Sequence, residues 1–408
     1  MSYIVTTIEN LAYSLNIANT LVRGKTSGIY SHRKTLTITP ESITHTDPEP
    51  KHTDITVAVP LDTIDASDDA SFHVQAYSIE PSLDTFCKRH AMDASDTQVM
   101  IQGGDGHIEI VAINSDKHGR VTNGNRPRTP TTVGDATMYP IFETTAGVLG
   151  RIWRSTRQTF KFTYGNDEKY PDGTRYHVGV VNDELLFAAT SGSVTSVATF
   201  PGRFNSTMIP TQGLTIPSQL YEVAANMDGA TGVNVYVGVD PKTGNSTRFI
   251  FHADNGTVVT ARLNDNPVPL NAESLYRKAT GVDVIPPAGD VTQFTVPTDV
   301  LVSALNDIVG RARQNKGVTI HGDSGSETIH VEVFAVNIPH DPLAAGSVRV
   351  SSLDVTGTPS TFDCPSLLNV VTQISTSSVR VTLRGPGNIA TFAEVGGDSV
   401  HGVMASAL

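Results

Sequence analysis

Apolar and polar residues alternate along residues 249–265, which read FIFHADNGTVVTARLND. Apolar side chains recur at every second position on both sides of the Asn255-Gly256 pair. Alternation with a period of two predicts strands that bury one face. An Asn-Gly pair suits a two-residue turn in which both residues have positive φ. The segment therefore predicts a half-buried β-hairpin, and it contains no residue with an obvious chemical role.

The same layout recurs in each third of the 408 residues. Pro-Ser pairs occur at 81–82, 217–218 and 365–366, and each precedes one or two turns of helical pattern. Pro fits the first turn of a helix, and Ser is a good cap. Strand-like runs follow each pair: TQVMIQGGDGHIEIVAI from 97, the hairpin described above, and VRVTLRGPGNIATFAEV from 379. Recurrence at this period indicates an internal repeat.

A second helical pattern precedes each Pro-Ser pair. The three segments begin at 7, 144 and 297 and read TIENLAYSLNIANTL, TTAGVLGRIWRSTRQ and PTDVLVSALNDIVGRA. Apolar residues of the last segment form one helix face: Val300, Leu301, Ala304, Leu305 and Ile308. Each third thus predicts helix, strands, helix and strands, which is an α+β fold of three similar domains. Pro- and Gly-rich stretches favour boundaries that give domains 1–135, 136–285 and 286–408.

Composition argues against several function classes. Hydrophobic residues make up 38% of the chain and charged residues 17%, which is an ordinary globular balance. No apolar run is long enough to span a membrane, and the N-terminus has no signal-peptide pattern. Cys87 and Cys364 form neither a disulfide framework nor a metal-ligand spacing, so we expect a cytoplasmic protein without metal or cofactor. No nucleophile motif is present, so we expect no enzyme.

The distribution of charge matters more than its sum. The formal net charge of −12 argues against a general nucleic-acid binder, because a surface that tracks phosphates needs basic residues. Two basic stretches without acidic residues nevertheless occur: Arg151, Arg154, Arg157 and Lys161, and then Arg311, Arg313 and Lys316. The three arginines of the first stretch are spaced i, i+3 and i+6 on a predicted helix. They indicate either a solvated helix face or a surface for phosphates.

Three segments together resemble the bacterial sliding clamp, the beta subunit of DNA polymerase III. Residues 247–269, TRFIFHADNGTVVTARLNDNPVP, resemble the segment that ends the second domain of that family. Residues 184–192, ELLFAATSG, resemble its Leu-x-x-Val-Ala-Thr-Asp-Gly strand, and the terminal GVMASAL resembles its Val-Val-Met-Pro-Met-Arg-Leu ending. The resemblance is good from about residue 140 onward and weak before it.

Two departures from the family pattern stand out. Residues 191–195 read SGSVT where the family has Asp-Gly-His-Arg-Leu, and residues 405–407 read ASA where it has Pro-Met-Arg. Divergence of this kind suggests a clamp encoded by a phage or plasmid. It also implies a shallower and less basic partner pocket with a different peptide preference.

The resemblance implies a specific function. In the family, two subunits join head to tail in a ring of six similar domains, in which helices line a hole around double-stranded DNA and antiparallel sheets lie outside. Such a homodimer is a processivity factor that tethers the replicative DNA polymerase, is placed on DNA by a clamp loader, and works on the nucleoid in the cytoplasm. Its DNA contacts are expected to be weak, independent of sequence and aimed at phosphates, because tight contacts would stop sliding.

A different class of function remains open from the sequence. Repeats rich in β-strands could also build a structural or adhesive protein, such as a virion component, in which the repeated domains only provide surface. Size in solution separates the two, because a clamp is a closed dimer and a shell protein is a monomer, a trimer or a larger assembly.

The resemblance also assigns candidate residues. The helices and loops expected around DNA carry these basic residues: Arg23, Lys25, Lys88, Arg89, Arg151, Arg154, Arg157, Lys161, Arg311 and Arg313. The groove that receives clamp-binding peptides of partner proteins corresponds to Thr190, Gly192, Ser193, Val194, Thr195, Pro269, Leu275, Val403, Met404, Ala405, Ser406 and Leu408. The contact between subunits is expected to use Ile108, Ile110, Ile308 and Val309.

Overall fold

The computed structural model describes most of the chain. The described residues are 2–20, 35–48, 53–90, 97–103, 107–113, 117–122, 136–161, 175–191, 193–210, 213–243, 246–263, 270–283, 291–310, 316–323, 327–335, 343–355 and 357–405. They belong to two compact units. The first unit comprises Met1–Gly150, Gly202–Met208 and Pro217–Asn266, and the second comprises Arg151–Pro201, Ile209–Ile216 and Pro267–Leu408.

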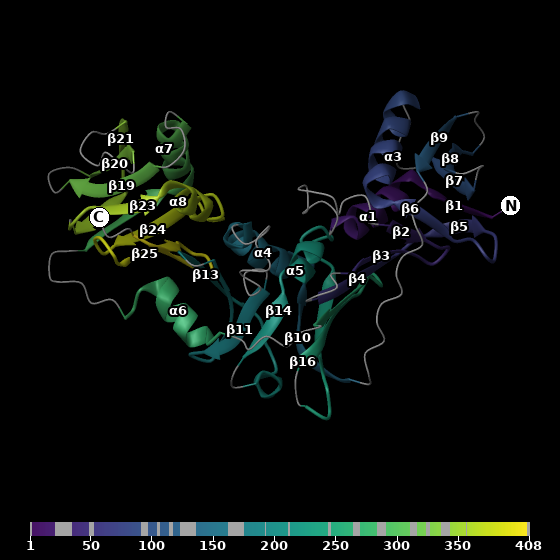
Figure 1. Cartoon of the computed structure of the whole chain (residues 1–408), viewed down its shortest axis with the longest axis horizontal. Coiled ribbons are helices and arrows are strands. Elements are labelled where there is room, and N and C mark those ends of the chain that lie inside the picture. Colours follow the sequence, from purple (N-terminus) through teal and green to yellow (C-terminus); the bar gives the residue numbers. More distant parts are fainter. Residues whose placement is uncertain are drawn as a thin grey trace. The chain divides into compact units, whose positions relative to one another are not determined.

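In its described part, the first unit is built from two sheets with helices packed on them, and Figure 1 labels most of its elements. The five-stranded sheet has the order β5 (Thr63–Ala66), β1 (Tyr3–Thr7), β7 (Gln98–Gly103), β8 (His107–Ala112) and β9 (His118–Thr122). The eight-stranded sheet has the order β10 (Thr137–Thr145), β15 (Gly232–Val239), β16 (Ser246–Ala253), β17 (Val258–Leu263), β4 (Thr53–Pro60), β3 (Ser42–Pro48), β2 (Thr35–Ile38) and β6 (Phe72–Gln75). The helices are α1 (Ile8–Ala18), α3 (Ala76–His90) and α5 (Gln219–Ala224).

The second unit also contains two sheets. The nine-stranded sheet has the order β14 (Leu214–Pro217), β11 (Arg175–Val181), β12 (Glu184–Thr190), β13 (Val194–Thr199), β26 (Ser399–Met404), β25 (Ile389–Glu394), β24 (Ser378–Leu383), β18 (Thr292–Pro297) and β22 (Ser352–Val355). The four-stranded sheet has the order β21 (Ala344–Arg349), β20 (Thr328–Ala335), β19 (Lys316–Asp323) and β23 (Ser360–Asp363). Its helices are α6 (Ala272–Thr280), α7 (Thr298–Gly310) and α8 (Cys364–Val371), and α4 (Ala146–Lys161) begins in the first unit.

The strand orders repeat three times. The first strand of each copy is followed in its sheet by the last three strands of that copy: β1-β7-β8-β9, β10-β15-β16-β17 and β18-β24-β25-β26. Apart from β5 and β22, the remaining strands also recur in one order: β4-β3-β2-β6, β13-β12-β11-β14 and β21-β20-β19-β23. The predicted α+β repeat is therefore confirmed. The boundaries at 135 and 285 lie outside the described residues and stay a prediction.

The Pro-Ser pairs mark helix starts in two copies but not in the first. Ser218 precedes α5, and Pro365 is in the first turn of α8, where Asp363 caps the helix by accepting a hydrogen bond from the Ser366 amide. Pro81 instead lies inside α3, which begins at Ala76. The apolar side chains of α3 extend on both sides of this pair and pack into the core, so burial carries the helix through the proline.

The hairpin at 246–263 has the predicted alternation but a different turn. Phe249, Phe251 and Val259 are buried on one face, as predicted. Only Gly256 has positive φ, whereas Asn255 accepts a hydrogen bond from the Thr257 amide through its side chain. The side-chain bond stabilises the turn without a left-handed asparagine. The two-residue left-handed turn of the described chain lies between β11 and β12 instead.

Helices cover one face of each sheet. Helix α1 packs on β3 and β4, α3 on β6 and β9, α7 on β20 and β21, and α8 on β19 and β26. Helix α6 packs on the opposite face of the nine-stranded sheet, against β11, β12, β13, β25 and β26. Among the described residues, no helix is long and apolar enough to cross a membrane.

Candidate binding surfaces

Helix α4 has a basic face and a buried face. Arg151, Arg154 and Arg157 are exposed, whereas Trp153 and Thr156 are buried in the second unit. The Thr156 hydroxyl donates to the Ile152 carbonyl oxygen at 2.7 Å and also contacts the Tyr176 hydroxyl. These contacts fix the rotation of the helix about its axis. The arginines are therefore held on the solvent side.

The α4 arginines differ from Lys88 in having no acidic partner among the described residues. Among the described residues, none of the three makes a hydrogen bond or ion pair. Lys88 on α3, by contrast, lies 2.6 Å from the Asp84 carboxylate. A cation without a carboxylate neighbour keeps its full charge for an external anion. The face formed by Arg151, Arg154 and Arg157, here called the α4 face, is the strongest described candidate for phosphate contact.

The other residues predicted to contact DNA are either paired with an acidic residue or outside the described part of the structure. Lys88 is exposed but paired. Arg89 lies in α3 and Lys161 in α4, with side chains outside the described part. Arg23, Lys25, Arg311 and Arg313 lie outside the described residues. Within their bounds, helices α1, α5, α7 and α8 contain no Lys or Arg.

The predicted peptide-groove residues gather where β13 meets β26. Val194 pairs with Val403 and Thr195 with Gly402, and the Met404 amide donates to the Ser193 carbonyl oxygen at 2.9 Å. The structure therefore brings together segments near 190–195 and 403–405 that are far apart in the sequence. Gly192, Pro269, Ser406 and Leu408 lie outside the described residues.

Most of these side chains belong to the core. Val194, Thr195, Val403 and Ala405 are at most 1% exposed. The side chains that remain accessible are those of Thr190, Ser193 and Met404, and Met404 is 40% exposed. Val194 and Thr195 are consecutive in β13 and both are buried, so both faces of the sheet are covered here and the accessible side chains lie at the strand ends. The candidate surface reduces to these three residues, here called the junction patch.

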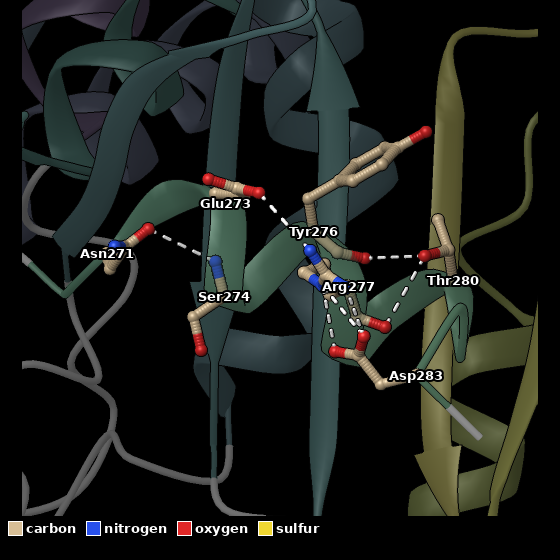
Figure 2. A network of polar contacts seen from close by, with 7 residues as sticks. All are labelled: Asn271, Glu273, Ser274, Tyr276, Arg277, Thr280 and Asp283. Atoms are coloured by element: carbon tan, nitrogen blue, oxygen red, sulfur yellow. Dashed lines mark hydrogen bonds and ion pairs between the residues drawn. The ribbon is translucent and has the colours of Figure 1, made fainter.

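Leu275 lies in a helix that the sequence reading missed. Asn271 caps α6 by accepting a hydrogen bond from the Ser274 amide, and Gly281 ends it with φ of 64°. Figure 2 shows Arg277 held between Glu273 and Asp283. The hydrogen bond from Arg277 lowers the pKa of Asp283. An Asn cap and a closing Gly were the available sequence signals.

Helix α6 lies tightly across the nine-stranded sheet. Its buried residues Ala272, Leu275 and Ala279 pack on four residues of the sheet: Val181, Leu186, Ala188 and Val197. At the other end, the Thr280 carbonyl oxygen accepts hydrogen bonds from Arg384 at 3.1 Å and Thr391 at 3.0 Å. Leu275 is therefore an anchor of α6 and is not an open pocket wall.

The predicted subunit contacts are buried inside a single chain. Ile108 and Ile110 are 4% and 1% exposed, because alternate residues of β8 face the core. Ile308 is also buried, and it leaves no room for a side chain at Gly346. The side chain of Val309 is outside the described part. The prediction is wrong for the three isoleucines, whose side chains are not a free surface.

Two sheet edges are better candidates for self-association. Strand β9 ends the five-stranded sheet, and β21 ends the four-stranded sheet. Edge strands present backbone donors and acceptors that another strand can pair with. Beside β9, residues of α3 and β9 line a hollow of about 300 Å³.

Sequence comparison finds no relatives, but structure comparison does. No family model and no curated protein matches the chain. The DNA polymerase III beta subunit of Thermotoga maritima superposes with a TM-score of 0.70 at 13% identity, over 100% of both chains. That of Borrelia burgdorferi gives 0.70 at 11%, and the Pseudomonas aeruginosa sliding clamp bound to griselimycin gives 0.67 at 16%, again over 100% of both chains. The chain has the sliding-clamp fold.

The sliding-clamp fold extends over the first third as well, where the sequence resemblance is weak. At these identities the likeness establishes the arrangement of strands and helices, and each binding surface must be argued from this chain. The residues of the α4 face, the junction patch and the two sheet edges carry that argument.

Proposed function

We propose that the protein is a DNA sliding clamp. In this function, a clamp loader places two chains, joined head to tail as a ring, around duplex DNA, and the ring tethers a replicative polymerase without enzymatic activity of its own. The observation that carries the proposal is the threefold clamp topology over the full chain. The α4 face, whose arginines have no partner among the described residues, supplies positive charge for phosphates on an otherwise acidic protein. We place this activity in the cytoplasm, on the nucleoid.

Two pairs of repeats within the chain are joined by strand pairing, and these two pairings predict how two chains would join. Strand β17 of the second copy pairs with β4 of the first, and β26 of the third copy pairs with β13 of the second. The equivalent strands that remain are β9 of the first copy and β21 of the third, and both are sheet edges. A heterologous contact between them in two chains closes a ring when the rotation closes. A second chain of the same protein is therefore the expected partner.

Strand registers indicate which residues face each other at that contact. Ala344 occupies the same position in the third repeat as Val57 does in the first. This follows from the residues that pair in succession across four neighbouring strands. They are Val74, Leu36, His45 and Val57 in the first repeat, and Phe362, Val318, Val333 and Ala344 in the third. Both series start two residues before a helix, at α3 and at α8.

The other side of the contact follows in the same way. Gly119 is equivalent to Val259, because each pairs with the residue two before the end of the middle hairpin strand, Ile110 or Phe251. Val259 pairs with Val57, so Gly119 of one chain is expected opposite Ala344 of the other chain. The adjacent pair is then His118 opposite Ala345.

A cysteine pair tests this contact. In a background with Cys87→Ser and Cys364→Ala, the double variant His118→Cys, Ala345→Cys should form a covalent dimer under mild oxidation. Residues opposed across antiparallel strands have Cα atoms about 4.5–5.5 Å apart, within reach of a disulfide. The matched control is His118→Cys with Arg349→Cys, displaced along β21 by about 13 Å. Equal cross-linking of both pairs, or of neither, would contradict the register.

The covalent ring then tests encirclement. Closed on a circular plasmid, it should stay bound in about 1 M NaCl, where the Debye length is only about 3 Å and phosphate contacts are screened. Cutting the plasmid once should release it, because a ring slides off a free end. Sedimentation or gel filtration of the complex measures retention. Loss from the uncut circle would reject the clamp, and a larger assembly in place of a dimer would favour a shell protein.

A further inference from the structure

The three sheet junctions have different chemistry at one equivalent position. His401 pairs with Phe392, two residues before the end of β25, so it is the equivalent of Val259 and Gly119. Across the first junction Val259 faces Val57, and across the second His401 faces Ser196. The free edge β9 has a glycine there. One junction is therefore apolar, one is polar, and one has no side chain on β9.

The polar junction contains a fully buried hydrogen-bonded cluster, here called the junction cluster: Thr159, Ser196, Gln373 and His401. The Gln373 side-chain amide donates to both the Ser196 hydroxyl and His401 Nδ1 at 3.0 Å. Ser196 also lies 2.7 Å from the Thr159 hydroxyl and 2.9 Å from His401 Nδ1. Residues of α4, β13, β26 and the end of α8 thus meet at one point.

The cluster is electrically neutral but strongly directional. Burial lowers the pKa of His401 to about 3, so the imidazole is uncharged near neutral pH. Neutral buried groups contribute little net stability compared with a well-packed apolar core, but each costs much when its partner is missing. Buried polar groups are best attested as devices that select one pairing over others.

We propose that the junction cluster selects which strands pair. It favours pairing of β26 with β13 and disfavours pairing of either strand with the free edges β9 and β21 of a second chain. An incoming β9 would place Gly119 opposite Ser196 and leave Ser196 without its His401 partner. An incoming β21 beside β26 would face His401 with Ala344, Gly346 or Val348, none of which has a polar side chain. Each mismatch leaves buried donors or acceptors unsatisfied and should disfavour the wrong pairing about tenfold or more.

This discrimination matters because the proposed ring depends on it. Strands β4, β13 and β21 are equivalent, as are β9, β17 and β26, so β9 of a second chain could compete with β17 for β4 and with β26 for β13. Exchange of the wrong edge would give open chains of subunits in place of rings. The cluster thus disfavours the wrong strand pairings between chains.

The test removes the polarity and traps the wrong pairing. The fourfold variant Thr159→Val, Ser196→Val, Gln373→Leu, His401→Val makes the second junction apolar, like the first. In a mispaired complex His118 takes the position of Val400, opposite Val197, and Arg120 takes that of Gly402, where a Cβ atom would lie 2.8 Å from the Ala279 Cα atom. His118→Cys and Val197→Cys are therefore placed in both the parent and the fourfold variant, each with Arg120→Gly, Cys87→Ser and Cys364→Ala. Intermolecular disulfides should rise about tenfold or more in the variant, with an unfolding midpoint no lower than that of the parent.

Every outcome decides the proposal. A folded variant without more cross-linking overturns it. If the fourfold variant does not fold, the double variant Gln373→Met, His401→Leu, which retains the Thr159–Ser196 bond, carries the same expectation. If neither folds, the cluster is required for stability and the discriminating role is rejected. The proposal rests on the clamp assembly, but the His118→Cys, Ala345→Cys pair reports the ring contact separately, so failure of one is distinguishable from failure of the other.

Discussion

Replacing Arg151, Arg154 and Arg157 with alanine should weaken binding to duplex DNA about tenfold or more, with no change in sequence preference. These side chains are exposed and have no acidic partner among the described residues, so their charge is available to phosphates. Each lost phosphate contact should lower the slope of log affinity against log salt by about 0.9. Fluorescence anisotropy with a short duplex, repeated over a salt series, measures both quantities.

A charge-matched control separates the α4 face from net charge. The triple variant Arg203→Ala, Lys242→Ala, Arg380→Ala also removes three exposed cations, but from scattered positions. It should leave the salt slope nearly unchanged, because DNA does not track those sites. Equal losses in the two variants would mean that only the overall charge matters. An unchanged affinity in the α4 variant would place DNA contact on other segments of the chain.

The repeat was predictable from the sequence because its signals are local. Alternation with period two and the three helical stripes each require only neighbouring residues, and they located α1, α4 and α7 as well as the three hairpins. Helix α6 was not predicted from the sequence because it is short and its buried face packs on strands that are distant in the sequence. Its stability comes from that contact more than from its own propensity.

The candidate surfaces were less predictable because alternation does not say which face is covered. Ile108 and Ile110 were recognisable as one face of a strand, but the alternation did not show that this face is the buried one. Val194 and Val403 were placed correctly near each other, yet the pairing of β13 with β26 makes them core residues. The resemblance to the clamp family predicted the neighbourhood, and the long-range strand pairing decided which side chains remain free.

The substitution Met404→Asp should weaken binding of a clamp-binding peptide from the cognate polymerase about tenfold or more, while the fold stays intact. We propose that Met404, at 40% exposure, is the apolar centre of the junction patch, beside Ser193 and Thr190. Peptide interfaces concentrate their energy in a few apolar contacts, each worth about 1–3 kcal/mol, and a carboxylate there would remove one such contact. Anisotropy of a labelled peptide measures the affinity, and thermal unfolding checks the fold.

Two controls define what the Met404 result means. Val395→Asp introduces the same charge at an exposed valine just beyond β25, at 42% exposure, and should leave peptide affinity unchanged. Val403→Asp buries the charge in the core and should unfold the protein, because an ionised carboxylate is strongly disfavoured there. Deleting residues 404–408 would be a poorer test, since it also removes buried Ala405. If Met404→Asp binds peptide like the parent, or Val395→Asp loses as much affinity, the junction patch is not the partner site.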